Sequence, residues 1–260
     1  MTDERSSAER RPPGALLRAA DVARSFKGVQ ALRGVTFELG QHEVVGLIGP
    51  NGAGKTTLIN LMTGFDLPTS GTIELGGQDV TRWRPARRAK AGLARTFQHG
   101  HLFGGLSVRE NIELGALGVG ARSGEARRRA DDLLDALELR AHADVRARLL
   151  PHGEQRKVGV GRALASRPSY VLMDEPAAGL AESDIEPFAQ VIRSVRDGFG
   201  AGVLIVDHNI ALMMEVSDRI EVLDQGRTLA RGTPEEIRQN IDVAAAYLGS
   251  SGVTGASAGA

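Results

Sequence analysis

The segment from Gly49 to Thr56 combines the residue types that bind phosphate. It has the sequence GPNGAGKT, which fits the pattern G-x-x-x-x-G-K-[ST]. Glycines let backbone N–H groups turn toward phosphate oxygens, and a helix that begins at this point adds positive potential. Lys55 would reach the β and γ phosphates of a nucleotide, and the Thr56 hydroxyl would bind Mg²⁺. An ordinary glycine turn between a strand and a helix is the alternative.

Two carboxylates follow a second apolar run of the chain. Asp174 and Glu175 come directly after residues 170–173, YVLM. Because adjacent carboxylates at the end of a buried strand are costly without a nearby cation, we expect Asp174 to hold Mg²⁺. Glu175 would orient or deprotonate an attacking water. The alternative is a pair of carboxylates that point to solvent from a loop.

A histidine follows a third apolar run. His208 stands after residues 203–206, VLIV, and after Asp207. At the end of a strand beside the other two, its imidazole would contact the γ phosphate or the attacking water. A histidine that only caps the strand with a polar group is the alternative.

Apolar runs and alternating segments indicate the sheets that would position these groups. Runs without polar alternation are typical of strands buried on both faces of a parallel sheet, and they lie at 44–48, 170–173 and 203–206. The helical patterns between them indicate an α/β core. Alternation at 35–39 and 72–75 predicts antiparallel strands half exposed to water, and residues 219–227 predict a late hairpin.

The middle of the chain is predicted to be helical. Residues 107–110, SVRE, form a capping box, and a helix with one apolar face and an arginine-rich opposite face follows at about 126–137. We therefore predict a helical lobe over about 96–165, inserted between two strands of the sheet. Residues 233–236, TPEE, open a last helix with proline at its first position.

Composition and the two ends indicate one folded domain. With 42% hydrophobic and 25% charged residues, the 260-residue chain has the balance of a globular protein. The polar beginning and the Gly/Ser/Ala-rich end predict disordered tails at 1–14 and 249–260, on either side of a domain at 15–248.

Charge and hydropathy exclude several classes of function. The 32 basic and 32 acidic residues cancel, so no overall field draws the chain to nucleic acid or to an anionic membrane. No apolar run is long enough to span a bilayer, and the first residues lack the apolar core of a secretion signal, so we expect a cytoplasmic protein. The absence of cysteine excludes disulfides and thiolate chemistry.

The order of these motifs resembles the ATP-binding cassette (ABC) family, the ATPase subunits of membrane transporters. The resemblance covers about 16–248 and implies an α/β fold with a P-loop NTPase core, a mostly parallel sheet, an N-terminal antiparallel β subdomain and an inserted helical subdomain. Residues 49–57 resemble the Walker A loop of that family. The resemblance implies ATP contacts from Gly49, Asn51, Gly52, Ala53, Gly54, Lys55, Thr56 and Thr57.

Other motifs of the family can be placed in the same way. Gln98, in ARTFQ, resembles the Q-loop glutamine, which touches Mg²⁺ or water and faces the membrane partner. Residues 171–175 resemble the Walker B strand and His208 the switch histidine. Phe26 stands where the family places an aromatic residue against adenine, with a core phenylalanine as the alternative. The resemblance implies catalytic roles for Glu175, His208, Gln98 and Lys55, and metal binding by Thr56, Gln98 and Asp174.

The segment LPHGEQ resembles the signature loop, which closes on the nucleotide of a second subunit in a head-to-tail dimer. The resemblance implies nucleotide contacts from Leu150, Pro151, Gly153, Glu154 and Gln155. Pro151 lacks the hydroxyl of many members, and loss of a hydrogen bond worth about 1.5 to 3 kcal/mol would slow turnover roughly 10- to 150-fold. Because Gly153 remains and proline suits a helix start, we interpret the segment as a branch variant. An impaired signature and an unrelated loop are the alternatives.

Two features depart from the pattern of the family. In residues 178–181, which resemble the D-loop, Ala181 stands where Asn or Asp is usual, so polar communication between the two ATP sites is in doubt. Gly159 and Gly161 interrupt the predicted signature helix, each at a cost of up to about 1 kcal/mol relative to alanine. Close packing and sequence drift both explain these glycines.

Within the family the chain is most similar to the branched-chain amino acid importer ATPases, through ARTFQHGHLFGGLSVRENI, DEPAAGL, GTPEEIRQN and AAAYLG. This likeness implies ATP hydrolysis that powers an importer, with urea, amides or other amino acids as alternative solutes. The implied partners are a second copy or a paralogous ATPase subunit in an ATP-dependent dimer, membrane permease subunits, and indirectly a solute-binding protein. The implied location is the cytoplasmic face of the inner membrane, with the permease docked around residues 98–103.

Three other interpretations are weaker. A nucleotide-binding regulatory module without hydrolysis is disfavoured by Glu175, whose loss would be the expected mark of such a protein. The arginine cluster at residues 82–90 could bind nucleic acid, but a solvated turn explains it, and we expect no nucleic-acid partner. His99 and His101 could bind a metal, but no third candidate ligand lies near them in the sequence.

Overall fold

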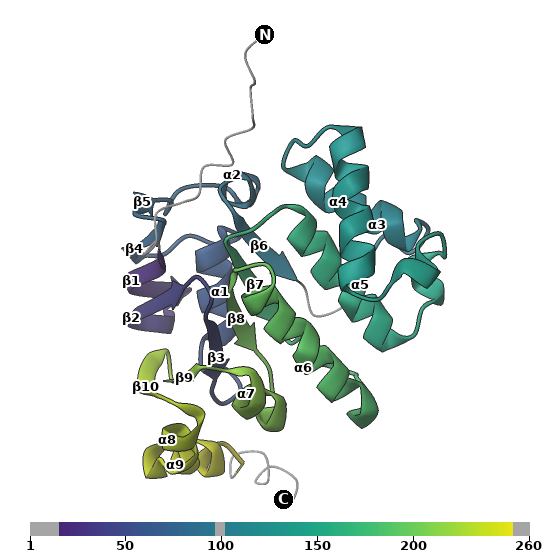
Figure 1. The fold of residues 1–260 in the computed structure, drawn as a ribbon. Helices are drawn as coiled ribbons and strands as arrows, with labels where there is room; N and C mark the ends of the chain where they lie inside the picture. The colour runs from purple at the N-terminus through teal and green to yellow at the C-terminus, as the bar shows by residue number, and fades with distance from the viewer. Residues whose placement is uncertain (1–15, 97–101, 252–260) are drawn as a thin grey trace, which may run out of the picture.

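The described residues, 16–96 and 102–251 of the computed structural model, form two β-sheets and a lobe of helices (Figure 1). In this part of the chain one sheet is antiparallel, with the strand order β2-β1-β4-β5. The larger sheet has the order β10-β9-β3-β8-β7-β6. The helical lobe enters between β6 and β7. The fold predicted from the sequence is therefore confirmed.

The antiparallel sheet forms the N-terminal part of the molecule. Its strands are β1 (Leu16–Phe26), β2 (Val29–Gly40), β4 (Ser70–Leu75) and β5 (Gln78–Asp79). β1 pairs with β2 on one side and with β4 on the other. Buried and exposed residues alternate in β4, because one face of the sheet packs on the core.

The larger sheet provides the scaffold of the site. Its strands are β3 (Val44–Ile48), β6 (Leu93–Thr96), β7 (Tyr170–Asp174), β8 (Gly202–Val206), β9 (Arg219–Asp224) and β10 (Arg227–Gly232). Every residue of β3, β7 and β8 is buried, and β8 runs parallel to both of the others. The apolar runs thus predicted the central strands correctly.

The hairpin predicted near the C-terminus is also present. β9 and β10 are antiparallel and joined at Gln225 and Gly226, which have φ angles of 45° and 78°. Two consecutive positive φ angles match the right-handed twist of a hairpin, and glycine adopts them without a steric penalty. The next helix, α8 (Pro234–Arg238), begins with proline at its first position, as predicted, and with a capping box of Thr233 and Glu236.

Helices cover both faces of the larger sheet. α1 (Lys55–Thr63) packs between the two sheets, in a core cluster that contains Val45 and Leu47 of β3. Val44 and Ile48 belong to the other core cluster, on the opposite face. That second face is covered by α5 (His152–Ala165), α6 (Glu182–Asp197) and α7 (Ile210–Val216).

The helical lobe consists of α3 (Val108–Gly118), α4 (Ser123–Ala136), two short 3₁₀ turns (Arg140–His142 and Ala147–Leu149) and α5. α3 starts with the predicted capping box, in which Ser107 and Glu110 each accept from the other's backbone N–H. The apolar face predicted for α4 is buried, including Ala126, Ala130, Leu133 and Leu134.

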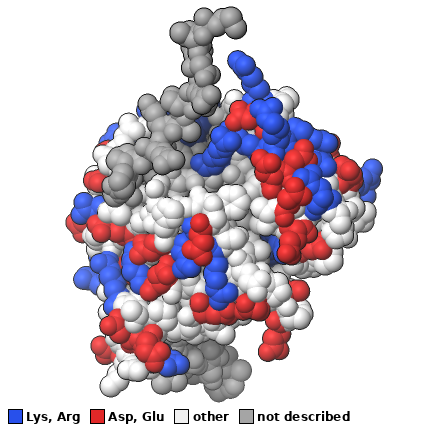
Figure 2. Space-filling model, in the orientation of Figure 1, with Lys and Arg blue, Asp and Glu red and all other residues white. Residues whose placement is uncertain are grey.

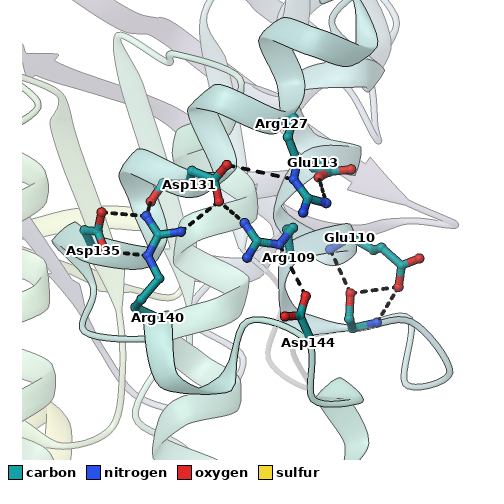
Figure 3. A network of polar contacts seen from close by, with 9 residues as sticks. Arg109, Glu110, Glu113, Arg127, Asp131, Asp135, Arg140 and Asp144 are labelled. Atoms are coloured by element: carbon teal, nitrogen blue, oxygen red, sulfur yellow. Dashed lines mark hydrogen bonds and ion pairs between the residues drawn. The ribbon is translucent and has the colours of Figure 1, made fainter.

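An ion-pair network ties α3 to α4 within the lobe (Figure 3). The mostly buried guanidinium of Arg109 pairs with Asp131 and lies 3.4 Å from Oδ1 of Asp144. Arg140 donates to Asp131 at 2.8 Å and to Asp135 at 2.5 Å. These contacts add ion pairs to the apolar core that α3 and α4 share.

The two glycines of α5 differ in their surroundings. A Cβ added to Gly161 would lie 2.9 Å from Cδ1 of Leu137 and 3.2 Å from Cδ1 of Ile112, so Gly161 permits close packing of the lobe. A Cβ added to Gly159 would meet nothing within 4 Å. Nothing in the structure explains Gly159.

The arginine cluster near α2 (Pro85–Lys90) is partly internal. The fully buried Arg88 donates to the carbonyl oxygens of Leu61 and Met62, both at 2.6 Å, at the end of α1. Burial lowers the pKa of Arg88 to about 10. The guanidinium of Arg87 lies 3.7 Å from the centroid of the Trp83 ring. Arg88 is thus a structural cap, and the surface cluster is smaller than the sequence indicates.

The last helix, α9 (Ile241–Ser251), runs past the predicted domain boundary at residue 248. The tail predicted at 1–14 lies outside the described residues, and so does the tail predicted at 249–260 from residue 252 onward. None of the helices within 16–96 and 102–251 is long and apolar enough to cross a bilayer.

Candidate nucleotide-binding and hydrolysis site

The groups singled out in the sequence meet at one edge of the larger sheet. Because β3, β8 and β7 are parallel neighbours, the residues that follow them lie side by side. Gly49 follows β3, Asp174 ends β7, and Asp207 follows β8. The backbone N–H of Glu175 donates to the carbonyl of Val206 at 2.7 Å, which fixes β7 and β8 at this edge.

The loop between β3 and α1 is tightly held. A Cβ at Gly49, where φ is 151°, would lie 2.0 Å from the carbonyl oxygen of Leu223. Gly54, with φ of 106°, would carry a Cβ 2.7 Å from the carbonyl oxygen of Ala31. The carbonyl of Ala53 accepts from the N–H of Gly226 at 3.0 Å. The loop is therefore positioned by the β9–β10 hairpin and by β2, and Gly49 and Gly54 are sterically required.

Lys55 lies inside this loop. Its Nζ donates to the carbonyl oxygens of Gly49 at 2.6 Å and Pro50 at 3.0 Å, and its side chain is mostly buried. Burial lowers the pKa of Lys55, and the charges of Glu175 and Asp174 oppose that shift. The ammonium is thus within electrostatic reach of both carboxylates, and it binds loop carbonyls at the place where phosphate oxygens would compete for it.

The other residues of the loop are more accessible. Asn51, Gly52 and Thr56 are exposed, and Thr57 is half-buried in the first turn of α1. Accessible groups at the N-terminus of a helix suit an anionic ligand. The geometry supports the phosphate-binding interpretation over an ordinary glycine turn, since an ordinary turn needs no buried lysine.

Asp174 already has a cationic partner in the protein. Nη2 of Arg95, on β6, donates to Oδ2 of Asp174 at 2.7 Å, and both side chains are largely buried. Sequence reasoning missed this partner and expected Mg²⁺ to supply the positive charge. Arg95 precedes Gln98 by three residues, yet nothing local in the sequence points to a residue on a different strand.

Glu175 and His208 face each other across the edge. Nε2 of His208 lies 3.3 Å from Oε1 of Glu175. Glu175 has a positive φ of 48°, a left-handed conformation that is strained for a non-glycine residue and that recurs at functional sites. The orientation of the Glu175 carboxylate is therefore set by its backbone conformation and by the His208 imidazole.

Asp207, not His208, caps the end of β8 with a polar group. This capping is the alternative role that the sequence predicts for His208. Its Oδ1 accepts from the N–H of Asn209 at 2.9 Å, and its Oδ2 accepts from the N–H of Ala177 at 2.8 Å. The side chain of Asn209 in turn caps α7. With these contacts made by its neighbours, His208 is left to face Glu175.

The segment LPHGEQ forms the start of α5. Pro151 is the N-cap residue, without a side-chain hydrogen bond, and the helix begins at His152. Gln155 Nε2 donates to the carbonyl of Leu150 at 2.8 Å, and His142 Nδ1 lies 2.9 Å from Oε2 of Glu154. The exposed Pro151 thus leads into a helix N-terminus, the arrangement that a backbone-based phosphate sensor requires.

The signature and D-loop segments touch within one chain. Nη2 of Arg156, in the second turn of α5, donates to the carbonyl of Ala178 at 2.6 Å. A Cβ at Gly153 would lie 3.3 Å from Cγ of Asp184 on α6. Ala181 is the N-cap of α6 and makes no side-chain cap. The sequence did not indicate the role of Arg156.

Phe26 is an exposed residue at the end of β1. Its exposed fraction is 43%, so it is not a core phenylalanine, and the guanidinium of Arg24 lies 4.4 Å from its ring centroid. An exposed ring can stack on a base. A contact that the sequence did not predict comes from α9, where the Tyr247 phenol makes a hydrogen bond with the Gly49 backbone and burial raises its pKa.

The residues present fit a Mg²⁺ ion held with a triphosphate. Asp174 and Thr56 offer a carboxylate and a hydroxyl, the hard oxygen ligands that Mg²⁺ prefers, and the ion normally takes its remaining ligands from phosphates and water. Within 16–96 and 102–251, no group of three or more His, Cys, Asp and Glu side chains is arranged to hold a metal ion. Gln98, His99 and His101 lie outside the described residues.

A phosphate loop, a carboxylate and a histidine at adjacent strand ends, and a helical lobe between β6 and β7 define an ATP-hydrolysing cassette. The chain belongs to the ABC transporter family, whose model matches residues 32–178. A second family model, described as "Branched-chain amino acid ATP-binding cassette transporter", matches residues 227–253. The predicted family and ATPase activity are confirmed.

Two relatives show how much of the chain this likeness covers. It is 39% identical to the high-affinity branched-chain amino acid transport ATP-binding protein LivG of Salmonella typhimurium, over 90% of this chain and 98% of LivG. It is 36% identical to BraF of Pseudomonas aeruginosa, also named a high-affinity branched-chain amino acid transport ATP-binding protein, over the same shares of both chains.

Solved structures agree with the fold. An ATP-binding cassette of an ABC transporter in its ADP conformation has a TM-score of 0.82 and 27% identity, over 90% of this chain and 99% of that one. A dimeric ATP-binding cassette in a post-hydrolysis state, bound to ADP and Pi, has a TM-score of 0.74 and 28% identity, over 84% and 98%.

Proposed function

We propose that this chain is the ATPase subunit that powers an importer for branched-chain amino acids. The observation that carries the solute class is the match of residues 227–253 to the branched-chain family model. Identity to LivG and BraF along most of the chain supports it. Import, the solute and the membrane partners are parts of this proposal.

The chemistry that we assign to the chain begins with binding. Lys55 exchanges the carbonyls of Gly49 and Pro50 for the β and γ phosphates of ATP. The other nucleotide contacts are the loop N–H groups, Thr57 and the ring of Phe26 on adenine. Thr56 and Asp174, with Gln98, would hold Mg²⁺, which when bound neutralises charge that develops on the transferred phosphoryl group.

Glu175 is the proposed general base. Its carboxylate accepts a proton from the attacking water, while His208, 3.3 Å away, orients the carboxylate and contacts the γ phosphate. Lys55 and Arg95 place positive charge beside the two carboxylates of this partly buried site.

The second half of each site is proposed to come from another subunit. The α5 N-terminus of one copy, residues 150–155, would close on the γ phosphate bound to its partner through backbone N–H groups and the helix dipole. The solved cassette in a post-hydrolysis state is dimeric, which supports the pairing of two subunits. The partner is a second copy or a paralogous ATPase subunit.

A groove beside β6 is the proposed permease-docking site. It has a volume of about 560 Å³ and lies between α2 and β6 on one side and α3 and α5 on the other. Two large exposed rings, Phe65 and Phe103, line it. Residue 103 ends the segment 98–103 that the sequence assigned to the permease, and an apolar groove suits a helix of a membrane partner.

The surface charge fits a peripheral protein without a nucleic-acid partner. Acidic and basic side chains are interspersed over the face shown in Figure 2. Such mixing gives no single-sign field for a phosphate backbone. Because the proposed function requires contact with a membrane permease, we place the chain on the cytoplasmic face of the inner membrane, held there by that permease.

The test is purification of the chain together with its native membrane partners, followed by ATPase assays in proteoliposomes with candidate solutes. We expect leucine, isoleucine or valine, delivered with the solute-binding protein, to raise turnover. Stimulation by urea, amides or other amino acids instead would overturn the solute assignment and leave the ATPase intact. Turnover that no solute stimulates would overturn the proposed role in import.

A further inference from the structure

We propose that Arg95 is a positioning residue that links the docking groove to the Mg²⁺-binding carboxylate of Asp174. The inference rests on the proposed function, since it assumes that Asp174 holds the metal and that the permease occupies the groove. Arg95 lies on β6, the edge strand of the larger sheet beside the helical lobe (Figure 1).

The guanidinium of Arg95 bridges two elements of the nucleotide site. Nη2 donates to Oδ2 of Asp174 at 2.7 Å, at the end of β7. Nη1 donates to Oδ1 of Asn60 at 2.7 Å and lies 3.4 Å from Oγ1 of Thr63. Asn60 and Thr63 belong to α1, the helix that starts with Lys55. One side chain therefore connects the two elements that carry two of the predicted metal ligands, Thr56 and Asp174.

The bridge depends on the shape of the guanidinium. Its planar fork presents donors in fixed directions, so it can hold Asp174 and Asn60 at once. A lysine ammonium would keep the positive charge, but as a compact point charge it would not hold Asp174 and Asn60 in fixed directions. A partner that holds a metal-binding carboxylate fixes its direction, and loss of such a partner typically weakens metal binding about 10- to 100-fold.

The same side chain also forms part of the groove wall. Arg95, Thr63 and Phe65 line the groove, and the guanidinium of Arg95 lies 5.5 Å from the centroid of the Phe65 ring. The Phe65 ring is 57% exposed, so a partner in the groove would press on it directly. Movement of the ring changes the support of Arg95, and Arg95 in turn directs Asp174.

The opposite wall provides a matched control. Phe103 is 54% exposed, and the guanidinium of Arg162 lies 5.8 Å from its centroid. Arg162 belongs to α5 of the helical lobe, not to the strand beside Asp174. Phe65 and Phe103 are thus equivalent in exposure and in their arginine contact, but differ in the connection to the metal site.

The experiment measures how much Mg²⁺ contributes to nucleotide binding by the isolated full-length chain. The readout is the ratio of the Kd for a non-hydrolysable ATP analogue in EDTA to its Kd in Mg²⁺. We expect Arg95→Lys to reduce this ratio by about 10-fold or more while the Kd in EDTA stays within about twofold. Asn60→Ala, which keeps the arginine, should change the ratio in the same direction.

The groove variants test the link itself. Phe65→Ala should reduce the ratio by about two- to fivefold, the scale of one exposed cation–π contact, whereas Phe103→Ala should leave it unchanged. Equal effects of the two variants, or an unchanged ratio in Arg95→Lys, would overturn the inference. A wild-type ratio of one would instead overturn the metal site of the proposed function and this inference with it.

Far-UV circular dichroism spectra and urea unfolding midpoints show whether each variant is folded. If Arg95→Lys loses its fold, Phe65→Ala and Asn60→Ala still decide the matter, because neither removes a charge. Both of these variants at the wild-type ratio would overturn the inference.

Discussion

His208 and Glu175 follow different strands, yet Nε2 of the histidine lies 3.3 Å from Oε1 of the glutamate. The contact exists because β8 and β7 are parallel neighbours and because the backbone of Glu175 adopts a positive φ. It joins the proposed base to the proposed phosphate contact before nucleotide arrives. The first prediction concerns this pair.

Replacing Glu175 with glutamine should stop hydrolysis and keep binding. The introduced amide has the shape of the carboxylate and can still contact His208, but it cannot accept a proton, so turnover should fall by about 10²- to 10⁴-fold. With ATP bound and uncleaved, Glu175→Gln should accumulate as a dimer in gel filtration. The exposed Glu235→Gln on α8 serves as the control. A Glu175→Gln protein that stays monomeric at saturating ATP would count against the closed dimer.

Lys55→Ala should abolish the high-affinity binding of ATP. The variant loses the Nζ that lies 2.6 Å from the Gly49 carbonyl and that we assign to the phosphates. A charged hydrogen bond is worth about 1.5 to 3 kcal/mol, so affinity should fall roughly 10- to 150-fold. Lys55→Arg should not restore the affinity for ATP, because a planar guanidinium does not fit a site formed around an ammonium.

Fluorescence titration with a labelled ATP analogue measures this loss. Lys157→Ala is the matched control, since Lys157 is a lysine of α5 outside the phosphate loop, with its Nζ 3.8 Å from Oε2 of Glu138. Phosphate release by Lys55→Ala at the wild-type rate would disprove the assigned role of the loop.

The two glycines of α5 should respond in opposite directions to alanine. Gly161→Ala places a Cβ 2.9 Å from Leu137 and 3.2 Å from Ile112, so it should destabilise the lobe by about 1 to 3 kcal/mol. Gly159→Ala meets nothing within 4 Å and should stabilise the protein by up to about 1 kcal/mol. Both changes add the same helix propensity. The difference between the two variants in the free energy of unfolding in urea therefore measures the effect of packing. Similar effects of both would show that Gly161 is not in a tight contact.

Glu221 should make stability depend on pH. It is fully buried on β9, Thr228 Oγ1 and Arg231 Nη2 each donate to its Oε1 at 3.0 Å, and burial raises its pKa above 4.5. Between 4.5 and the raised value the folded state binds more protons than the unfolded state. The free energy of unfolding therefore decreases as pH rises through that window.

Glu221→Gln replaces the buried carboxylate with a neutral amide and keeps the Oε1 atom that accepts from Thr228 and Arg231. At pH 7 the variant should be more stable than the wild type, because burial disfavours the charged carboxylate and not the neutral amide. The difference should shrink as pH falls toward 4.5, which thermal unfolding at about pH 7 and about pH 5 can follow. The exposed Glu182→Gln should show no such convergence. A Glu221→Gln protein that is less stable at pH 7 would show that the arginine contacts outweigh burial.

The sequence by itself determined the elements and most of the proposed site. The apolar runs identified β3, β7 and β8, the capping residues located the starts of α3 and α8, and the glycine pattern located the phosphate loop. These features can be predicted because each depends on contiguous residues, through strand periodicity, helix capping or the φ freedom of glycine.

Only the tertiary structure decided which side chains meet. The sequence predicted Mg²⁺ as the cation beside Asp174 and gave no sign of Arg95, which the fold brings to the same carboxylate from a position 79 residues away. The sequence pattern placed Arg88 in a basic surface, but burial makes it the cap of α1. The order of strands in the sheet, β6 beside β7, determines such pairs, and strand order depends on the packing of the whole core instead of on any local pattern.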